Sequence, residues 1–129
     1  MGKLRHIVLS VDDVHKTADF YRSVFDLEIT ESEDHRVWLS DGVVSLAIID
    51  ANKHANASGG PRGLNHFGFA VEDIDGTVDQ VLTQGGFHHD TVSGKDRGAA
   101  RQVKLKDPNG VYLEVVNTEH ARKKWHLPG

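Results

Sequence analysis

The sequence predicts an α+β fold built from two tandem βαβββ units, and two observations support this. Strand-like and helix-like segments follow one another as strand, helix and three strands, and the same order returns in the second half of the chain. A segment at 50–65, rich in Asn, Ala, Ser and Gly, separates the halves and is typical of a linker. We therefore expect one domain spanning residues 1–129, made of repeat units at 4–50 and 65–117.

Composition restricts the class of protein. With 129 residues, 38% of them hydrophobic and 26% charged, the chain is long and apolar enough for one globular domain. The absence of cysteine excludes disulfides, thiolate metal sites and cysteine nucleophiles. A net charge of −4 predicts no nucleic-acid partner. No apolar run reaches membrane-spanning or signal-peptide character, so we expect a cytoplasmic protein without a membrane partner.

In the first unit, the apolar run at 6–11 predicts a buried strand. Asp12 and Asp13 follow it and can cap a helix. Apolar residues then recur at helical spacing over 14–25. Three short strands complete the unit, at 27–30, 36–40 and 43–49, with a hairpin turn at Asp41-Gly42 before the last.

The second unit begins at His66, which answers His6 at an offset of 60 positions. Thr77 keeps the same offset from Thr17, so the helix is repeated as well. Gly85-Gly86 is typical of a helix C-cap. Three further strands are expected at 87–92, 103–105 and 111–116, the last after the tight turn Asp107-Pro108-Asn109-Gly110.

Glu114 lies inside the apolar run of the last strand, where an unpaired carboxylate would be costly to bury. Because side chains alternate across a strand, Glu114 shares a face with Tyr112 and Val116. If helices cover one face of each unit, the opposite faces form a shared concave surface that also carries the two strand-opening histidines, His6 and His66. A group on that surface should compensate the charge of Glu114.

Two structural alternatives stay open for these residues. A histidine at the start of a strand is more often a core or surface residue than a metal ligand, and only the equivalence of His6 and His66 in a repeat favours the ligand role. For Glu114 the alternative is a salt bridge to Arg101 or Lys104.

The duplicated pattern resembles the vicinal oxygen chelate superfamily, which includes glyoxalase I, bleomycin-resistance proteins, fosfomycin-modifying enzymes and type I extradiol dioxygenases. The resemblance rests on His6, on Asp19-Phe20-Tyr21-Arg22, on His66, and on Asp107-Pro108-Asn109-Gly110 together with Glu114. It implies a glyoxalase-like open barrel around a metal-binding cleft, a small-molecule substrate and a homodimer.

The resemblance also implies a ligand set of His6, His66 and Glu114. The fourth ligand position of the family falls on Leu46, which cannot bind a metal. Two imidazoles and one carboxylate suit Fe²⁺ with open coordination positions, while Mn²⁺, Zn²⁺ or Ni²⁺ could occupy the same site. A metal with free positions can bind a substrate through two oxygens and stabilise developing negative charge.

We therefore expect a metal-dependent enzyme, most like an extradiol-type dioxygenase by its ligand set. The alternatives are a glyoxalase-like lyase or isomerase, a fosfomycin-type thiol transferase and, outside the enzymes, a bleomycin-resistance-like binding protein. Glu114, Tyr112 and Lys104 are the expected catalytic residues. Trp38 and Gln102 are expected to bind substrate.

The remaining polar residues and segments are expected to lie outside the metal-binding site. His35, His88 and His89 are expected at the surface. The segment Gly94 to Gly98 is expected to be a mobile loop near the mouth of the cleft and lacks the pattern of a phosphate-binding loop. The tail at 118–129 is expected either to form a short helix that covers the cleft or a neighbouring subunit, or to be a disordered basic end.

Overall fold

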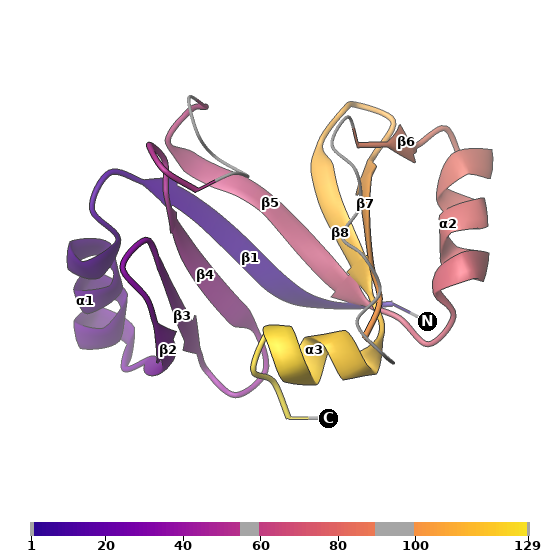
Figure 1. Ribbon diagram of the computed structural model, residues 1–129. Coiled ribbons are helices and arrows are strands. Elements are labelled where there is room, and N and C mark those ends of the chain that lie inside the picture. Colours follow the sequence, from indigo (N-terminus) through magenta and orange to yellow (C-terminus); the bar gives the residue numbers. More distant parts are fainter. Residues whose placement is uncertain (1, 55–59, 90–99, 129) are drawn as a thin grey trace. The chain divides into compact units, whose positions relative to one another are not determined.

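The computed structural model describes residues 2–54, 60–89 and 100–128 of the chain (Figure 1). The elements are β1 (Lys3–Val11), α1 (Val14–Phe25), β2 (Glu28–Ser32), β3 (Arg36–Ser40), β4 (Ser45–Asp50), β5 (Gly63–Ala70), α2 (Ile74–Thr83), β6 (Phe87–His88), β7 (Gln102–Lys106), β8 (Tyr112–Val116) and α3 (Thr118–Lys124). This order confirms the α+β class and the duplicated βαβββ pattern. By its internal contacts the chain divides into a first unit, residues 6–65, and a second unit, residues 66–129 with 1–5.

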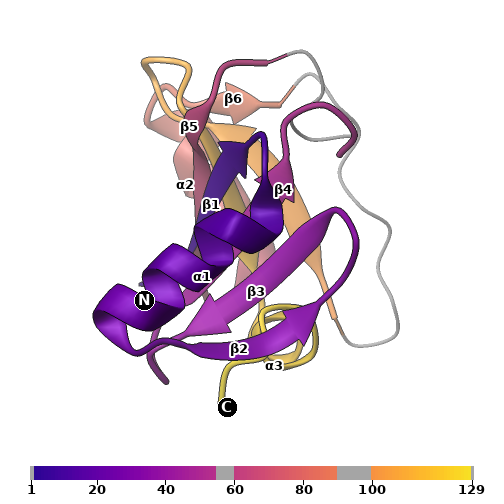
Figure 2. The ribbon, with the colours of Figure 1, turned by 90° about the vertical axis from the view of Figure 1, so that its left-hand side faces the viewer.

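The first unit is a four-stranded sheet in the order β2-β3-β4-β1, with β1 parallel to β4 and the other neighbours antiparallel. Helix α1 lies across one face of this sheet (Figure 2). The core between them contains Val14 and Ala18 of the helix and Val37, Leu39 and Ile48 of the strands. Alternation along each strand therefore leaves the intervening side chains on the face away from α1.

The second unit repeats this arrangement in the order β5-β8-β7-β6, with β5 parallel to β8. Its core is formed by Val71 and Ile74 beside Leu105, Leu113 and Val115. Phe67 and Phe69 of β5 pack against that core. His66 and Gly68 alternate with these phenylalanines, so they lie on the opposite face of the sheet.

The two helices begin in the same way, which explains why the repeat is visible in the sequence. Asp13 caps α1 by accepting a hydrogen bond from the backbone N–H of Lys16, and Asp73 caps α2 through Gly76. The hydroxyl groups of Thr17 and Thr77 donate to the carbonyls of these two aspartates at 2.8 and 2.7 Å. At the end of α2, Gly85 has φ +97°, a conformation that favours glycine and confirms the expected cap.

Several boundaries differ from the sequence prediction. Strand β1 starts at Lys3 rather than residue 6, and β4 starts at Ser45 rather than residue 43. The later start of β4 has a local cause, because Asp41 Oδ1 accepts hydrogen bonds from the N–H groups of Val43 and Val44, both at 2.8 Å. The turn uses these two amides, so the strand begins after them. Residues 90–92 of the expected strand and the segment Gly94 to Gly98 lie outside the described residues.

The C-terminal tail forms a helix. Asn117 caps α3 by accepting a hydrogen bond from the N–H of His120. Ala121, Trp125 and Leu127 are buried. The alternative of a disordered basic end is therefore wrong for residues 118–124. Among the residues that the structure describes, no helix is long and apolar enough to cross a membrane.

Candidate metal centre

The centre of the candidate site in the second unit is Glu114. Leu113 and Val115 point into the core, so Glu114 lies on the face away from α2. Its neighbours in register are Gly68 on β5 and Lys104 on β7. Glu114 is only 3% exposed, and a carboxylate at this depth requires polar partners.

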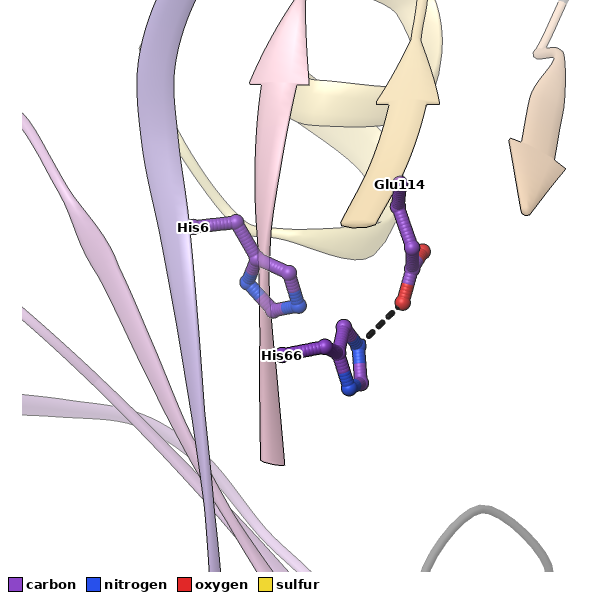
Figure 3. Close-up of side chains that lie close together, drawn as sticks. All are labelled: His6, His66 and Glu114. Carbon is purple, nitrogen blue, oxygen red and sulfur yellow. Dashed lines mark ion pairs between the residues drawn. The ribbon is translucent and has the colours of Figure 1, made fainter. Parts of the chain in front are cut away.

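Three side chains of the second unit surround that carboxylate. His66 pairs through Nε2 with Oε1 of Glu114 (Figure 3). The amide of Gln102 donates a hydrogen bond to Oε2, and the hydroxyl of Tyr112 donates to Oε1 at 3.4 Å. The guanidinium of Arg101, considered above as an alternative partner, forms an ion pair with Asp75 at 3.2 Å. The buried carboxylate is thus held by one imidazole and two hydrogen-bond donors.

Tyr112 links the histidine and the carboxylate. Its ring stacks on the ring of His66, with centroids 4.1 Å apart and planes inclined by 23°. Burial, and then the charge and hydrogen bond of Glu114, raise the pKa of the Tyr112 phenol well above its usual range. The phenol therefore remains protonated and acts as a hydrogen-bond donor to Glu114, not as a phenolate base.

His6 belongs to the first unit and is 2% exposed. Its Nδ1 lies 3.3 Å from the hydroxyl oxygen of Ser45 on β4, which is its partner in register. Its ring also stacks on Trp38, with centroids 5.4 Å apart and planes inclined by 23°. Together Ser45 and Trp38 restrict both the position and the rotation of the imidazole.

The residue beside His6 on β4 is Ser45. Leu46, which corresponds in sequence to the fourth ligand of the family, does not lie there. Leu46 is the register partner of Ile7 and packs against the core under α1. Its side chain therefore lies on the helix-covered face of the sheet, opposite His6. Leu46 is absent from the candidate centre because of its position on the strand as well as its chemistry.

The remaining candidates lie on the same sheet faces as the candidate ligands of their own units. Trp38 is 7% exposed, and the guanidinium carbon of Arg36 lies 5.1 Å from its ring centroid. Lys104 is half-buried beside Glu114 on the neighbouring strand. Gln102 contacts Glu114 directly, which gives it a clear role in orienting the carboxylate.

His89 is a residue that the sequence interpretation missed. His88 is exposed as expected, but His89 is half-buried and its ring lies on Tyr112, with centroids 4.2 Å apart. The surface interpretation is therefore wrong for His89. Phe87 pairs with Lys106, which places His89 level with Lys104 on the face of the candidate site, and the sequence gives no local signal of this pairing.

Comparison with known proteins places the fold and the family. The profile of the Glyoxalase/Bleomycin resistance protein/Dioxygenase superfamily matches residues 3–115. A protein of Vibrio parahaemolyticus named probable lactoylglutathione lyase is 24% identical over 93% of this chain and 94% of its own length. A protein of Synechocystis with the same name is 22% identical over 92% of this chain and 98% of its own length.

Solved structures of similar fold include a methylmalonyl-CoA epimerase in complex with methylmalonyl-CoA and NH₄⁺. It superposes with a TM-score of 0.70 at 20% identity and covers 99% of each chain. The methylmalonyl-CoA epimerase of Mycobacterium tuberculosis gives a TM-score of 0.67 at 17% identity, covering 88% of this chain and 86% of its own. At these identities the likeness establishes the fold alone.

Proposed function

The chain belongs to the Glyoxalase/Bleomycin resistance protein/Dioxygenase superfamily, and on that premise we propose that it is a divalent-metal-dependent enzyme acting on a small oxygen-chelating substrate. The proposed ligands are His6, His66 and Glu114, each of which is buried and offers one ligand atom. The observation that carries the proposal is the buried ion pair of His66 and Glu114. Burial of a carboxylate against an imidazole is costly in the absence of a cation, and a divalent ion bound by both side chains would offset that cost.

The donor set fits a divalent cation. Imidazole nitrogen and carboxylate oxygen suit Fe²⁺, Mn²⁺, Zn²⁺ and Ni²⁺, and the ratio of two imidazoles to one carboxylate favours Fe²⁺. When bound, such an ion supplies Lewis-acid chemistry by polarising a substrate oxygen. With only three protein ligands, coordination positions stay open for two oxygens of a substrate.

The side chains around these ligands have separate roles. Gln102 and the protonated Tyr112 hold the two oxygens of Glu114 in a fixed orientation. We propose that Lys104, which is beside Glu114 in register, contacts the substrate and stabilises negative charge that develops on it. Trp38, whose ring stacks on His6, is proposed to contact the substrate beside that histidine.

We propose a lyase or isomerase reaction that moves a proton at a substrate carbon next to a carbonyl oxygen. The relatives described above carry the names of a lyase and an epimerase, which supports this class over ring cleavage. Proton transfer needs no oxygen molecule but needs a base. The carboxylate of Glu114 is proposed to accept the proton from the substrate carbon and to return it, while the Lys104 cation offsets the negative charge left on the substrate.

The first experiment is metal analysis of protein purified without chelator, followed by titration of the apoprotein with Mn²⁺, Fe²⁺, Zn²⁺ and Ni²⁺. We expect one ion per chain. The loaded protein is then assayed with lactoylglutathione and with methylmalonyl-CoA, the compounds in the names of the relatives, as representatives of the two reaction types. Failure to bind any of these ions would refute the proposal and favour a small-molecule binding protein.

Ring-cleaving dioxygenase is the second candidate, because two histidines and a carboxylate are the ligand set that leaves Fe²⁺ open to both substrate and oxygen. Oxygen uptake by the Fe²⁺-loaded protein with a panel of catechols separates the two classes. Uptake that depends on a catechol would support the dioxygenase, and its absence together with isomerase or lyase turnover would support the first candidate.

A further inference from the structure

Three aromatic side chains lie in contact in the second unit, with Tyr112 stacked on His66 and tilted by 43° against His89. Tyr112 is in contact with His66 at a centroid distance of 4.1 Å and with His89 at 4.2 Å. The strand order in the second unit is β5-β8-β7-β6. Tyr112 lies on β8, His66 lies on β5 to one side of it, and His89 directly follows β6 on the other side. The two imidazoles therefore approach Tyr112 from strands on opposite sides of it.

The backbone holds His89 in this position. Its N–H donates a hydrogen bond to the carbonyl of Lys104 at 3.1 Å, which continues the pairing of β6 with β7 by one residue. The adjacent His88 is exposed and pairs in register with Leu105. The two neighbouring histidines thus differ in their surroundings. Of the ring contacts described for them, the one with Tyr112 is made by His89.

The contact with His89 acts on the ligands through Tyr112. The phenol ring has two tasks, since its face supports the imidazole of His66 and its hydroxyl donates to Oε1 of Glu114. Both tasks require one side-chain orientation of Tyr112. A ring packed against the outer side of Tyr112 limits rotation and keeps solvent from it, so that His66 and Glu114 stay aligned before an ion arrives.

We propose that His89 is a positioning residue of the metal centre, which fixes Tyr112 and through it the orientation of His66 and Glu114. This inference rests on the proposed metal-binding function. It assigns to His89 a task that is carried by the contact of its ring with Tyr112.

The experiment compares His89→Ala, His89→Phe and the matched control His88→Ala, each in the full chain. In the apoprotein, NMR should show shifted ring resonances of Tyr112 and His66 in His89→Ala and unchanged ones in His88→Ala. Titration with Mn²⁺ or Zn²⁺ should show metal affinity lowered about tenfold in His89→Ala, as is typical when an outer partner of a ligand is lost. His89→Phe keeps a ring and should bind within about twofold of the wild type.

Different outcomes overturn different statements. If the wild type binds metal and His89→Ala binds it as well as His88→Ala does, the role of His89 is refuted while the proposed function stands. Equal losses in His89→Phe and His89→Ala would also refute it, since the ring itself would then be unimportant. If the wild type binds no metal, the proposed function fails. Unchanged Tyr112 resonances in the apoprotein of His89→Ala would independently refute the contact between His89 and Tyr112. Urea denaturation of each variant identifies any loss that comes from incomplete folding.

Discussion

The amide of Gln102 donates a hydrogen bond to Oε2 of Glu114, while Oε1 of the same carboxylate faces His66. The two residues lie on the neighbouring strands β7 and β8. Because the amide of Gln102 occupies Oε2, Oε1 is the oxygen that can bind a metal together with His66. The orientation of the proposed ligand is therefore determined within the second unit.

Replacement of Gln102 by leucine tests this relationship. Gln102→Leu leaves Oε2 of a buried carboxylate without its amide donor, and we expect metal affinity to fall about tenfold because the ligand loses its orientation. Gln80→Leu, at an exposed position of α2, is the matched control and should leave affinity unchanged. Isothermal titration with Zn²⁺ or Mn²⁺ measures both. Equal affinities of the two variants would show that Gln102 does not orient Glu114.

The proposed ligands themselves should give larger effects. We expect His66→Ala and Glu114→Ala to lower metal affinity by more than about a hundredfold, since each removes a ligand atom and not only its support. His88→Ala, an exposed histidine in the same unit, should bind metal as the wild type does. If all three variants lost affinity to the same degree, the assignment of the ligands would be wrong.

The same carboxylate should also affect the stability of the metal-free protein. Glu114→Ala removes a buried carboxylate and leaves the amide of Gln102 and the hydroxyl of Tyr112 without their acceptor, so the free energy of unfolding should fall by about 3 kcal/mol. Glu119→Ala breaks ion pairs with Arg122 and Lys123 at the surface and should have a much smaller effect. Urea denaturation of both apoproteins is the measurement, and a reversed order would contradict the buried pair.

The raised pKa of Tyr112 leads to a prediction about alkaline pH. Because the folded state keeps the phenol protonated, the stability that comes from Tyr112 is fully present below its unfolded pKa of about 10 and is lost only above it. Removal of the hydroxyl by Tyr112→Phe keeps the stack on His66 but removes the donor to Glu114.

The folded wild type and Tyr112→Phe should therefore show the same absorbance change at the tyrosinate wavelength between about pH 9 and pH 11, because Tyr112 does not ionise in that interval. Metal affinity of Tyr112→Phe should fall about fivefold, since the long hydrogen bond from Tyr112 to Glu114 is worth on the order of 1 kcal/mol. A wild-type titration that exceeds the variant by one phenol near pH 10 would show that Tyr112 is not held as described.

Much of the fold could be predicted because its determinants are local. Asp13 was expected to cap the first helix, and Asp73 occupies the corresponding position of the repeat. Both helices begin directly after these caps. The start of β4 could not be predicted in the same way, since the pair Val43-Val44 has strong strand propensity. Hydrogen bonds from their amides to Asp41 determine the boundary instead.

Part of the candidate centre could be predicted from local sequence, and part depends on the pairing of distant strands. Alternation along β8 placed Glu114 with Tyr112 and opposite Leu113, which the structure confirms. His89 was missed because its burial depends on which strand lies beside it, and pairing between distant segments is not visible in local composition.

The face of β4 that carries Ser45 provides the last test. A shift of one residue along a strand moves a side chain to the opposite face, and the register of His6 with Ser45 places Leu46 under α1. Ser45→Ala should lower metal affinity a few-fold without much loss of stability, because it frees Nδ1 of His6 from a hydroxyl partner at 3.3 Å. Leu46→Ala should lower the free energy of unfolding by about 2 kcal/mol and leave metal affinity unchanged. Metal titration and urea denaturation of both variants measure this contrast, and the reverse pattern would place Leu46 rather than Ser45 beside His6.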